Sequence, residues 1–167
     1  MRWDKLFADL EGMVDDDALA ERDALVHDLR DGERAATTWR QLVGGEVSFE
    51  VAGAGRVDGS VQSGNDRVVH VLTDRAHMLV NPDAVMAILS ASRRAATSSP
   101  VTSRLGWPHV FRMLQRDQDR VQVHRTDSST WAGTVVMVGA DFVQIRDEAE
   151  NAPMIPYAAL AVVSCPR

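Results

Sequence analysis

The chain has 167 residues, of which 45% are hydrophobic and 25% are charged, and its formal net charge is −6 at pH 7. The single cysteine excludes an internal disulfide and a thiolate-rich metal site, and this cysteine usage indicates a reducing compartment. No uncharged run approaches the roughly 18 residues of a membrane-spanning helix, and the first ten residues carry charges that a signal-peptide core lacks. We therefore expect a cytoplasmic protein of one domain or two small ones, without a membrane partner.

The negative charge is concentrated at the N-terminus. Residues 1–33 hold 11 acidic and 4 basic side chains, whereas the rest of the chain is close to neutral. Trp3, Phe7 and Leu10 recur there at helical spacing, as a narrow apolar stripe on an acidic helix. A solvated helical face explains the charge, and so does an arm that docks on a basic partner. We predict acidic helices in this region and take the Trp3/Phe7/Leu10 stripe as a candidate protein contact.

From Glu46 the apolar period changes to two, which is typical of β-strands. We expect five short strands between residues 46 and 90, after a short helix that begins near Thr38. The stretches between these strands are rich in glycine, asparagine and aspartate, as short antiparallel connections require. After a linker, Trp107-Pro108 opens a helix with proline in its first turn, and a second run of strands follows.

The two β-rich segments are copies of each other. Residues 47–89 and 121–163 align without a gap at an offset of 74, which indicates the duplication of one supersecondary unit. The repeated positions are apolar or turn residues, so they specify a core and not a chemistry. The identical pairs are Val47/Val121, Gly59/Gly133, Val61/Val135, Val69/Val143, Pro82/Pro156, Ala84/Ala158 and Ala87/Ala161.

A helix followed by five short strands, with a glycine inside the second strand, is the plan of small SH3-like barrels. The glycine permits the sharp bend of a strand that serves two sheets. We therefore predict a mainly β fold with N-terminal helices and two tandem five-stranded barrels, each preceded by a helix. The predicted parts are N-terminal acidic helices at 1–37, a first helix-plus-barrel repeat at 38–90, a linker at 91–104 and a second helix-plus-barrel repeat at 105–167.

The second copy resembles the Sm-like fold, including the bacterial Sm-like RNA chaperone. The resemblance is carried by VQVHRTDSSTWAGTVVMVGADFVQI and by the later segment MIPYAALAVV. Asp141 stands two residues before Val143 in the Asp-x-apolar-Asn pattern, and Gln144 takes the place of the base-contacting asparagine. The first copy has Arg67 and His70 at these two positions. The last Sm motif, an Arg-Gly or Lys-His pair before the final strand, is absent from both copies.

The whole chain is also similar to a family of uncharacterised actinobacterial proteins. These proteins begin Met-Arg-Trp-x-x-Leu-Phe-x-Asp-Leu-Glu and end in a GT-x-x-x-VG-x-D strand pair. Residues 1–11 and 133–141 carry this resemblance here. The resemblance implies architecture and no activity.

The chemistry-bearing residues form no recognisable catalytic motif. The five histidines lack a ligand spacing such as His-x-x-x-His, Cys165 has no histidine near it in sequence, and no Gly-x-Ser-x-Gly elbow occurs. We therefore expect no enzyme, no metal and no cofactor. The first functional hypothesis is an interaction or assembly module, because small barrels leave edge strands that pair with a neighbour's edge. A protein partner or self-association is expected.

The alternative hypothesis is an RNA-binding Sm-like protein with a degenerate nucleotide site. Its contacts would be Asp141, Gln144, Tyr157 and Arg125, because single-stranded nucleic acid is held by ring stacking over a positive groove. The first copy has Asp83 at the position matched to Tyr157, so the nucleotide site is not repeated.

Overall fold

The computed structural model describes residues 38–92 and 106–166, together with eight helical residues between 22 and 35. The chain divides into two compact units, Met1–Thr38 and Trp39–Arg167. The candidate contact residues Trp3, Phe7 and Leu10 lie outside the described residues.

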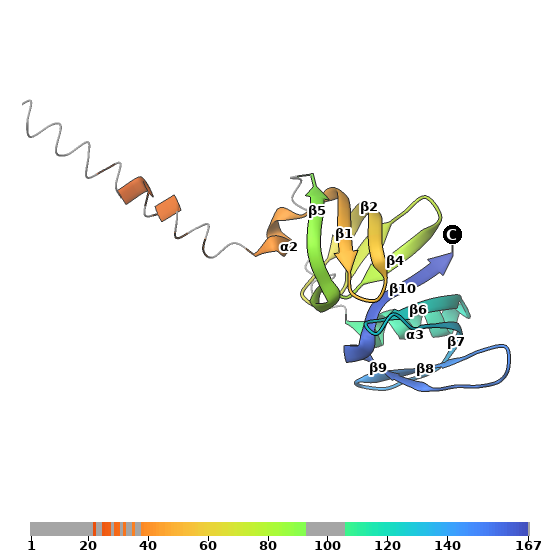
Figure 1. Ribbon diagram of the computed structural model, residues 1–167. Helices are drawn as coiled ribbons and strands as arrows, with labels where there is room; N and C mark the ends of the chain where they lie inside the picture. The colour runs from red at the N-terminus through yellow and green to blue at the C-terminus, as the bar shows by residue number, and fades with distance from the viewer. Residues whose placement is uncertain are drawn as a thin grey trace, which may run out of the picture. The chain divides into compact units, whose positions relative to one another are not determined.

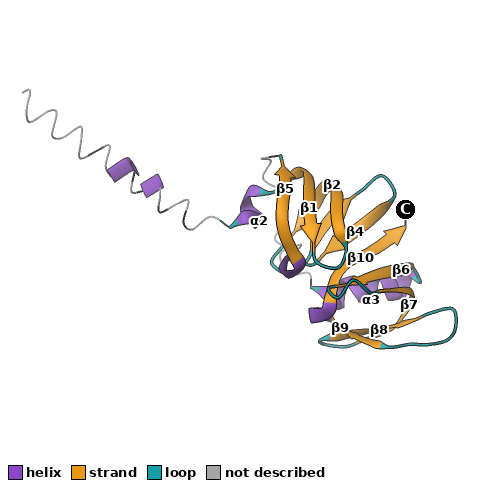
Figure 2. Cartoon of the chain, viewed as in Figure 1, coloured by secondary structure: helices purple, strands orange, loops and turns teal. Residues whose placement is uncertain are grey.

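The second unit is mainly β, as the sequence predicts (Figures 1 and 2). α2 (Trp39–Leu42) precedes the first copy, and α3 (Trp107–Asp117) precedes the second. The strands of the first copy are β1 (Gly45–Val51), β2 (Gly55–Gly64), β3 (Val69–Leu72), β4 (Ala76–Val80) and β5 (Val85–Ala91). The strands of the second copy are β6 (Arg120–Arg125), β7 (Thr130–Val138), β8 (Phe142–Arg146), β9 (Met154–Pro156) and β10 (Leu160–Pro166). The 3₁₀ turns η1 (Pro82–Ala84) and η3 (Tyr157–Ala159) precede β5 and β10.

All ten strands belong to one antiparallel sheet, in the order β5-β1-β2-β3-β4-β10-β6-β7-β8-β9. Each copy therefore places its own strands in the same order: fifth, first, second, third, fourth. Within the described ladder neither set of five strands closes on itself by hydrogen bonds, and the sheet is open at β5 and β9. The strands of the two predicted five-stranded barrels are thus parts of one continuous sheet.

The registers show that the two copies are not related by one constant offset. Val47 faces Gly59 as Val121 faces Gly133, which agrees with an offset of 74 in the first two strands. In the fourth strand of each copy the offset is 75, because Val69 on β3 faces Val80 on β4, whereas Val143 on β8 faces Ile155 on β9. One residue has therefore been inserted before β9 in the second copy. The gapless match of Pro82 with Pro156 is wrong as a structural equivalence, because Pro156 corresponds to Asn81.

β10 joins the two copies. It pairs with β6 of its own copy and with β4 of the first copy. The side chains of residues 160–163 are fully buried. Ala161 and Val162 pack into the core of the first copy, whereas Leu160 and Val163 pack into that of the second. The contact between β4 and β10, here called the seam, is therefore part of both cores.

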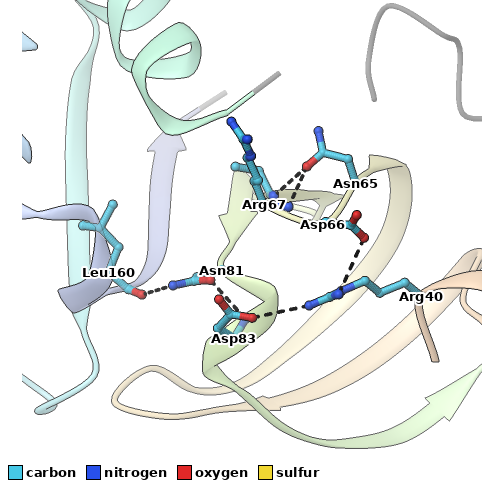
Figure 3. Close-up of polar contacts among 8 residues, drawn as sticks. Arg40, Asn65, Asp66, Arg67, Asn81, Asp83 and Leu160 are labelled. Carbon is cyan, nitrogen blue, oxygen red and sulfur yellow. Dashed lines mark hydrogen bonds and ion pairs between the residues drawn. The ribbon is translucent and has the colours of Figure 1, made fainter. Parts of the chain in front are cut away.

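Asn81 fixes one end of the seam (Figure 3). Its backbone N–H donates to the main-chain oxygen of Ala161 at 2.9 Å, and its side-chain Nδ2 donates to that of Leu160 at 2.8 Å. Its Oδ1 accepts the N–H of Asp83 at 3.0 Å, which begins η1. The side chain is buried, so each of these bonds replaces a hydrogen bond to water that burial removes.

We expect Asn81→Ala to lower the free energy of unfolding by about 1–3 kcal/mol, because it leaves buried backbone groups without partners. Urea denaturation followed by circular dichroism measures the change. Asn151→Ala is the matched control, since Asn151 is exposed and its amide bonds Asp147 within a surface turn. Equal effects of the two substitutions would contradict the role given to Asn81.

Gly59 and Gly133 lie where a neighbouring strand approaches too closely for a side chain. A Cβ at Gly133 would lie 1.9 Å from the main-chain oxygen of Arg146, and one at Gly59 would lie 2.4 Å from that of Leu72. From the sequence, the glycine inside each second strand is attributed to a sharp bend of that strand. The structure shows why a side chain is excluded there in both copies: the backbone of the neighbouring strand lies too close.

Gly133→Ala should therefore destabilise the fold by about 1–3 kcal/mol through overpacking. The melting temperature measured by calorimetry reports the loss. Gly64→Ala serves as the comparison, because the nearest atom to its added Cβ would be a Val69 methyl at 3.4 Å, an ordinary van der Waals contact. The prediction fails if both variants melt together with the unmodified chain.

Candidate functional site

A pocket of about 410 Å³ lies at the seam. The first copy contributes side chains of β3 and β4 and the turn before β3, and the second copy contributes α3, Asp119 and the end of β10. The walls are mostly apolar. They include the buried side chains of Val68, Val110 and Leu114.

α3 packs on β7 and β8 of its own copy, and at the pocket its side chains also meet the outer face of the β3–β4 hairpin of the first copy. His70 faces Leu79, and Leu72 faces His77, so these four side chains share the face opposite the Val71 core face. Trp107, Val110, Phe111 and Leu114 are the buried face of α3, and the helix begins with proline in its first turn as the sequence predicts. The pocket therefore exists only because both copies contribute walls.

His70 and His77 form a hydrogen-bonded pair in this pocket. The Nε2 of His70 lies 2.9 Å from the Nδ1 of His77. The two rings are stacked, with centroids 5.2 Å apart and an interplanar angle of 28°. The pair supplies polar atoms within a lining that is otherwise largely apolar.

Burial lowers the pKa of His70, and the neighbouring His77 lowers it further. At the end of β10, burial raises the pKa of the Cys165 thiol to about 11, and the charge of Asp119 adds to this effect. Near pH 7 the His70 imidazole and the Cys165 thiol are therefore both uncharged. A protonated thiol is a poor nucleophile, so the arrangement suits binding rather than covalent catalysis.

No group of three or more His, Cys, Asp or Glu side chains among the described residues is arranged to hold a metal ion. The imidazole of His70 is bonded to a second imidazole and not to a carboxylate. The His70 ring is thus oriented by a second imidazole rather than by the carboxylate that orients many catalytic histidines.

The residues of the alternative RNA hypothesis lie around η3, on the second copy. The Tyr157 ring stacks on Phe111 with centroids 5.8 Å apart and an interplanar angle of 8°, and its hydroxyl donates to the main-chain oxygen of Gly139 at 2.9 Å. Its backbone N–H donates to the main-chain oxygen of Asp141 at 2.8 Å, so these two residues are adjacent. The Gln144 amide donates to the main-chain oxygen of Ala152 at 2.7 Å. Two of the expected nucleotide contacts are therefore used within the chain.

Arg125 lies at the end of β6, where its Nε is 3.8 Å from the Asp127 carboxylate. The next residue, Thr126, donates its N–H to the main-chain oxygen of Ala159 in η3. The structure therefore places Arg125 beside the same turn as Tyr157. No motif in the sequence singles out the histidine pair or Asn81. The contact could have been expected from the positions of His70 and His77, which lie on either side of the short Thr73-Asp74-Arg75 connection between two strands.

No protein-family model matches the chain, and no curated protein matches it. No helix in the described part of the chain is long and apolar enough to cross a membrane. The functional conclusion therefore depends on the geometry of the seam, its pocket and the free edges.

We expect the free energy of unfolding to fall as the pH is lowered from 7.5 to 5.5. The folded-state pKa of His70 lies below the 6.5 of a free histidine, so the unfolded chain binds this proton first and is favoured by acid. His70→Gln should make the pH dependence shallower, as measured by urea denaturation at several pH values. Burial also lowers the pKa of His124, which accounts for a remaining slope. His109→Gln, at an exposed site on α3, is the control, and a slope that His70→Gln leaves unchanged would contradict the assignment.

Proposed function

We propose that the chain is a non-enzymatic assembly module, built from a duplicated Sm-like, SH3-like barrel, and that it self-associates through the free edge of β5. The common strand order of the two copies and the glycine within each second strand support this barrel plan. The observation that carries the proposal is the contrast between the two free edges of the sheet.

The seam supports edge-to-edge joining as a property of this sheet. β4 and β10 pair over five consecutive positions, from Val162 with Val80 to Pro166 with Ala76. One copy is therefore already joined to another by a backbone ladder and by shared core side chains. An interface of the same kind between chains needs no new type of contact.

β9 is poorly suited to repeat the seam with another chain. It has only three residues, Pro153 precedes it and Pro156 ends it. Pro156 corresponds to Asn81, whose backbone N–H and side chain both donate across the seam. Proline has no N–H to donate, and prolines at an exposed edge are a common protection against unwanted pairing.

β5 has no such protection. Its seven residues carry no charge, and two large apolar side chains are exposed, Met86 at 71% and Leu89 at 52%. No described strand pairs with its outer edge. The unpaired N–H and C=O groups of a long uncharged edge strand readily pair with a strand of another chain. Antiparallel pairing of β5 with β5 of a second copy gives a two-fold interface that closes as a dimer.

RNA binding receives less support than assembly. Tyr157 is stacked and hydrogen-bonded within the second copy, and the Gln144 amide is bonded to the backbone. A nucleotide that used both groups would first have to break these contacts.

Native mass spectrometry of the full chain at several concentrations tests the proposal. We expect a dimer free of nucleic acid, and we expect Leu89→Lys to shift it to monomer by placing like charges across the interface. Met154→Lys on β9 is the matched control, since Met154 is 66% exposed on the other free edge. Dimers that survive Leu89→Lys but not Met154→Lys would refute the β5 contact. A monomer at every concentration, or nucleic acid that copurifies and is lost with salt, would refute self-assembly as the function.

A further inference from the structure

We infer that the pocket at the seam is a binding site for a small uncharged molecule with an apolar body and one hydrogen-bonding group, which the His70/His77 pair engages. This site is separate from the β5 edge. It therefore goes beyond the assembly role and does not depend on it.

The size and lining of the pocket fit such a ligand. Its volume of about 410 Å³ lies within the roughly 300–1,000 Å³ that small-molecule sites occupy. Val68, Val110 and Leu114 form buried apolar walls, and Met113 stands near the surface with 46% of its side chain exposed. Small-molecule sites combine such walls with a few placed polar groups. The histidine pair supplies those groups here.

The pair also defines which polar group the ligand carries. When both imidazoles are uncharged, the pair holds two N–H groups, and one of these is used in the bond between His70 and His77. One donor and one acceptor remain, on His70 Nδ1 and His77 Nε2. A shift of the shared tautomers exchanges their roles. A hydroxyl, a ketone or an amide on the ligand is matched in either state.

Ions are disfavoured at this site. A cation would lose its hydration among apolar side chains, and the solvent-exposed Asp119 carboxylate compensates little of that loss; an anion would face the same carboxylate. The neutral state of the His70 imidazole near pH 7 offers no compensating charge. The chemistry of the lining therefore selects an uncharged ligand.

The two copies differ where the pocket lies. In the second copy Gln144 stands for His70, and at the offset of 75 Ala152 stands for His77. The Gln144 amide is bonded to the main-chain oxygen of Ala152, so that hairpin satisfies its own polar group. The histidine pair is thus present only in the β3–β4 hairpin, where side chains of α3 complete the pocket.

Titration with prodan, an uncharged naphthyl ketone whose emission shifts to the blue in apolar surroundings, tests the site on the full chain. We expect saturable binding of one prodan per chain. Met113→Trp should narrow the pocket and weaken binding at least tenfold, and Met154→Trp, an exposed methionine elsewhere, should not. Binding should persist in Leu89→Lys, which excludes the β5 edge as the site. Absence of saturable binding, or equal affinity in Met113→Trp and the unmodified chain, would overturn the inference.

Cys165 gives a second readout of where prodan binds. It is the only cysteine of the chain and lines this pocket, so its alkylation by N-ethylmaleimide reports access to the site. Saturating prodan should slow the alkylation severalfold at fixed pH. An alkylation rate unchanged by prodan would place the probe elsewhere and refute the proposed site.

Discussion

The ladder between β4 and β10 determines the arrangement of the rest of the described structure. It lets one strand complete two cores, because neighbouring side chains of β10 enter opposite copies. It also requires a residue without a side chain in the turn between β1 and β2. Gly53, in the left-handed region at φ +73°, lies against the end of β6, and a Cβ there would be 1.9 Å from the main-chain oxygen of Arg125. The turn between β1 and β2 can approach the second copy only without a side chain.

The seam gives the fifth strands of the two copies, β5 and β10, different surroundings. β5 and β10 occupy the same place in their copies, yet β10 is flanked by strands on both sides and β5 on one. The burial of their side chains follows this difference. Residues 160–163 are fully buried, whereas Met86 and Leu89 are exposed. The same seam brings side chains of α3 beside the β3–β4 hairpin, where the two copies together enclose the pocket. Joining two copies of one unit at the seam thus leaves an open edge at β5 and a proline-ended edge at β9, and it creates the pocket.

The sequence predicted the mainly β content, the two sets of five strands and the start of α3 at Trp107-Pro108, because these depend on contacts within one copy. The seam could not be predicted in the same way. Its residues differ between the copies, as Asn81 and Pro156 do, so a comparison of the repeats passes over them. Identical prolines and alanines also aligned across the inserted residue and concealed the change of register. The histidine pair was missed because seven residues separate its members in sequence, and only the hairpin register brings them together.

The order of the strands along the chain has a consequence for synthesis. The side chains that complete the first core, Ala161 and Val162, are made about 80 residues after the strand they join, since Asn81 and Leu160 are 79 residues apart. During translation the core of the first copy therefore lacks Ala161 and Val162 until nearly the whole described sheet has been synthesised. Loop closure over this distance costs entropy before any contact repays it. We therefore expect the two copies, although duplicated in sequence, to fold together as one cooperative unit.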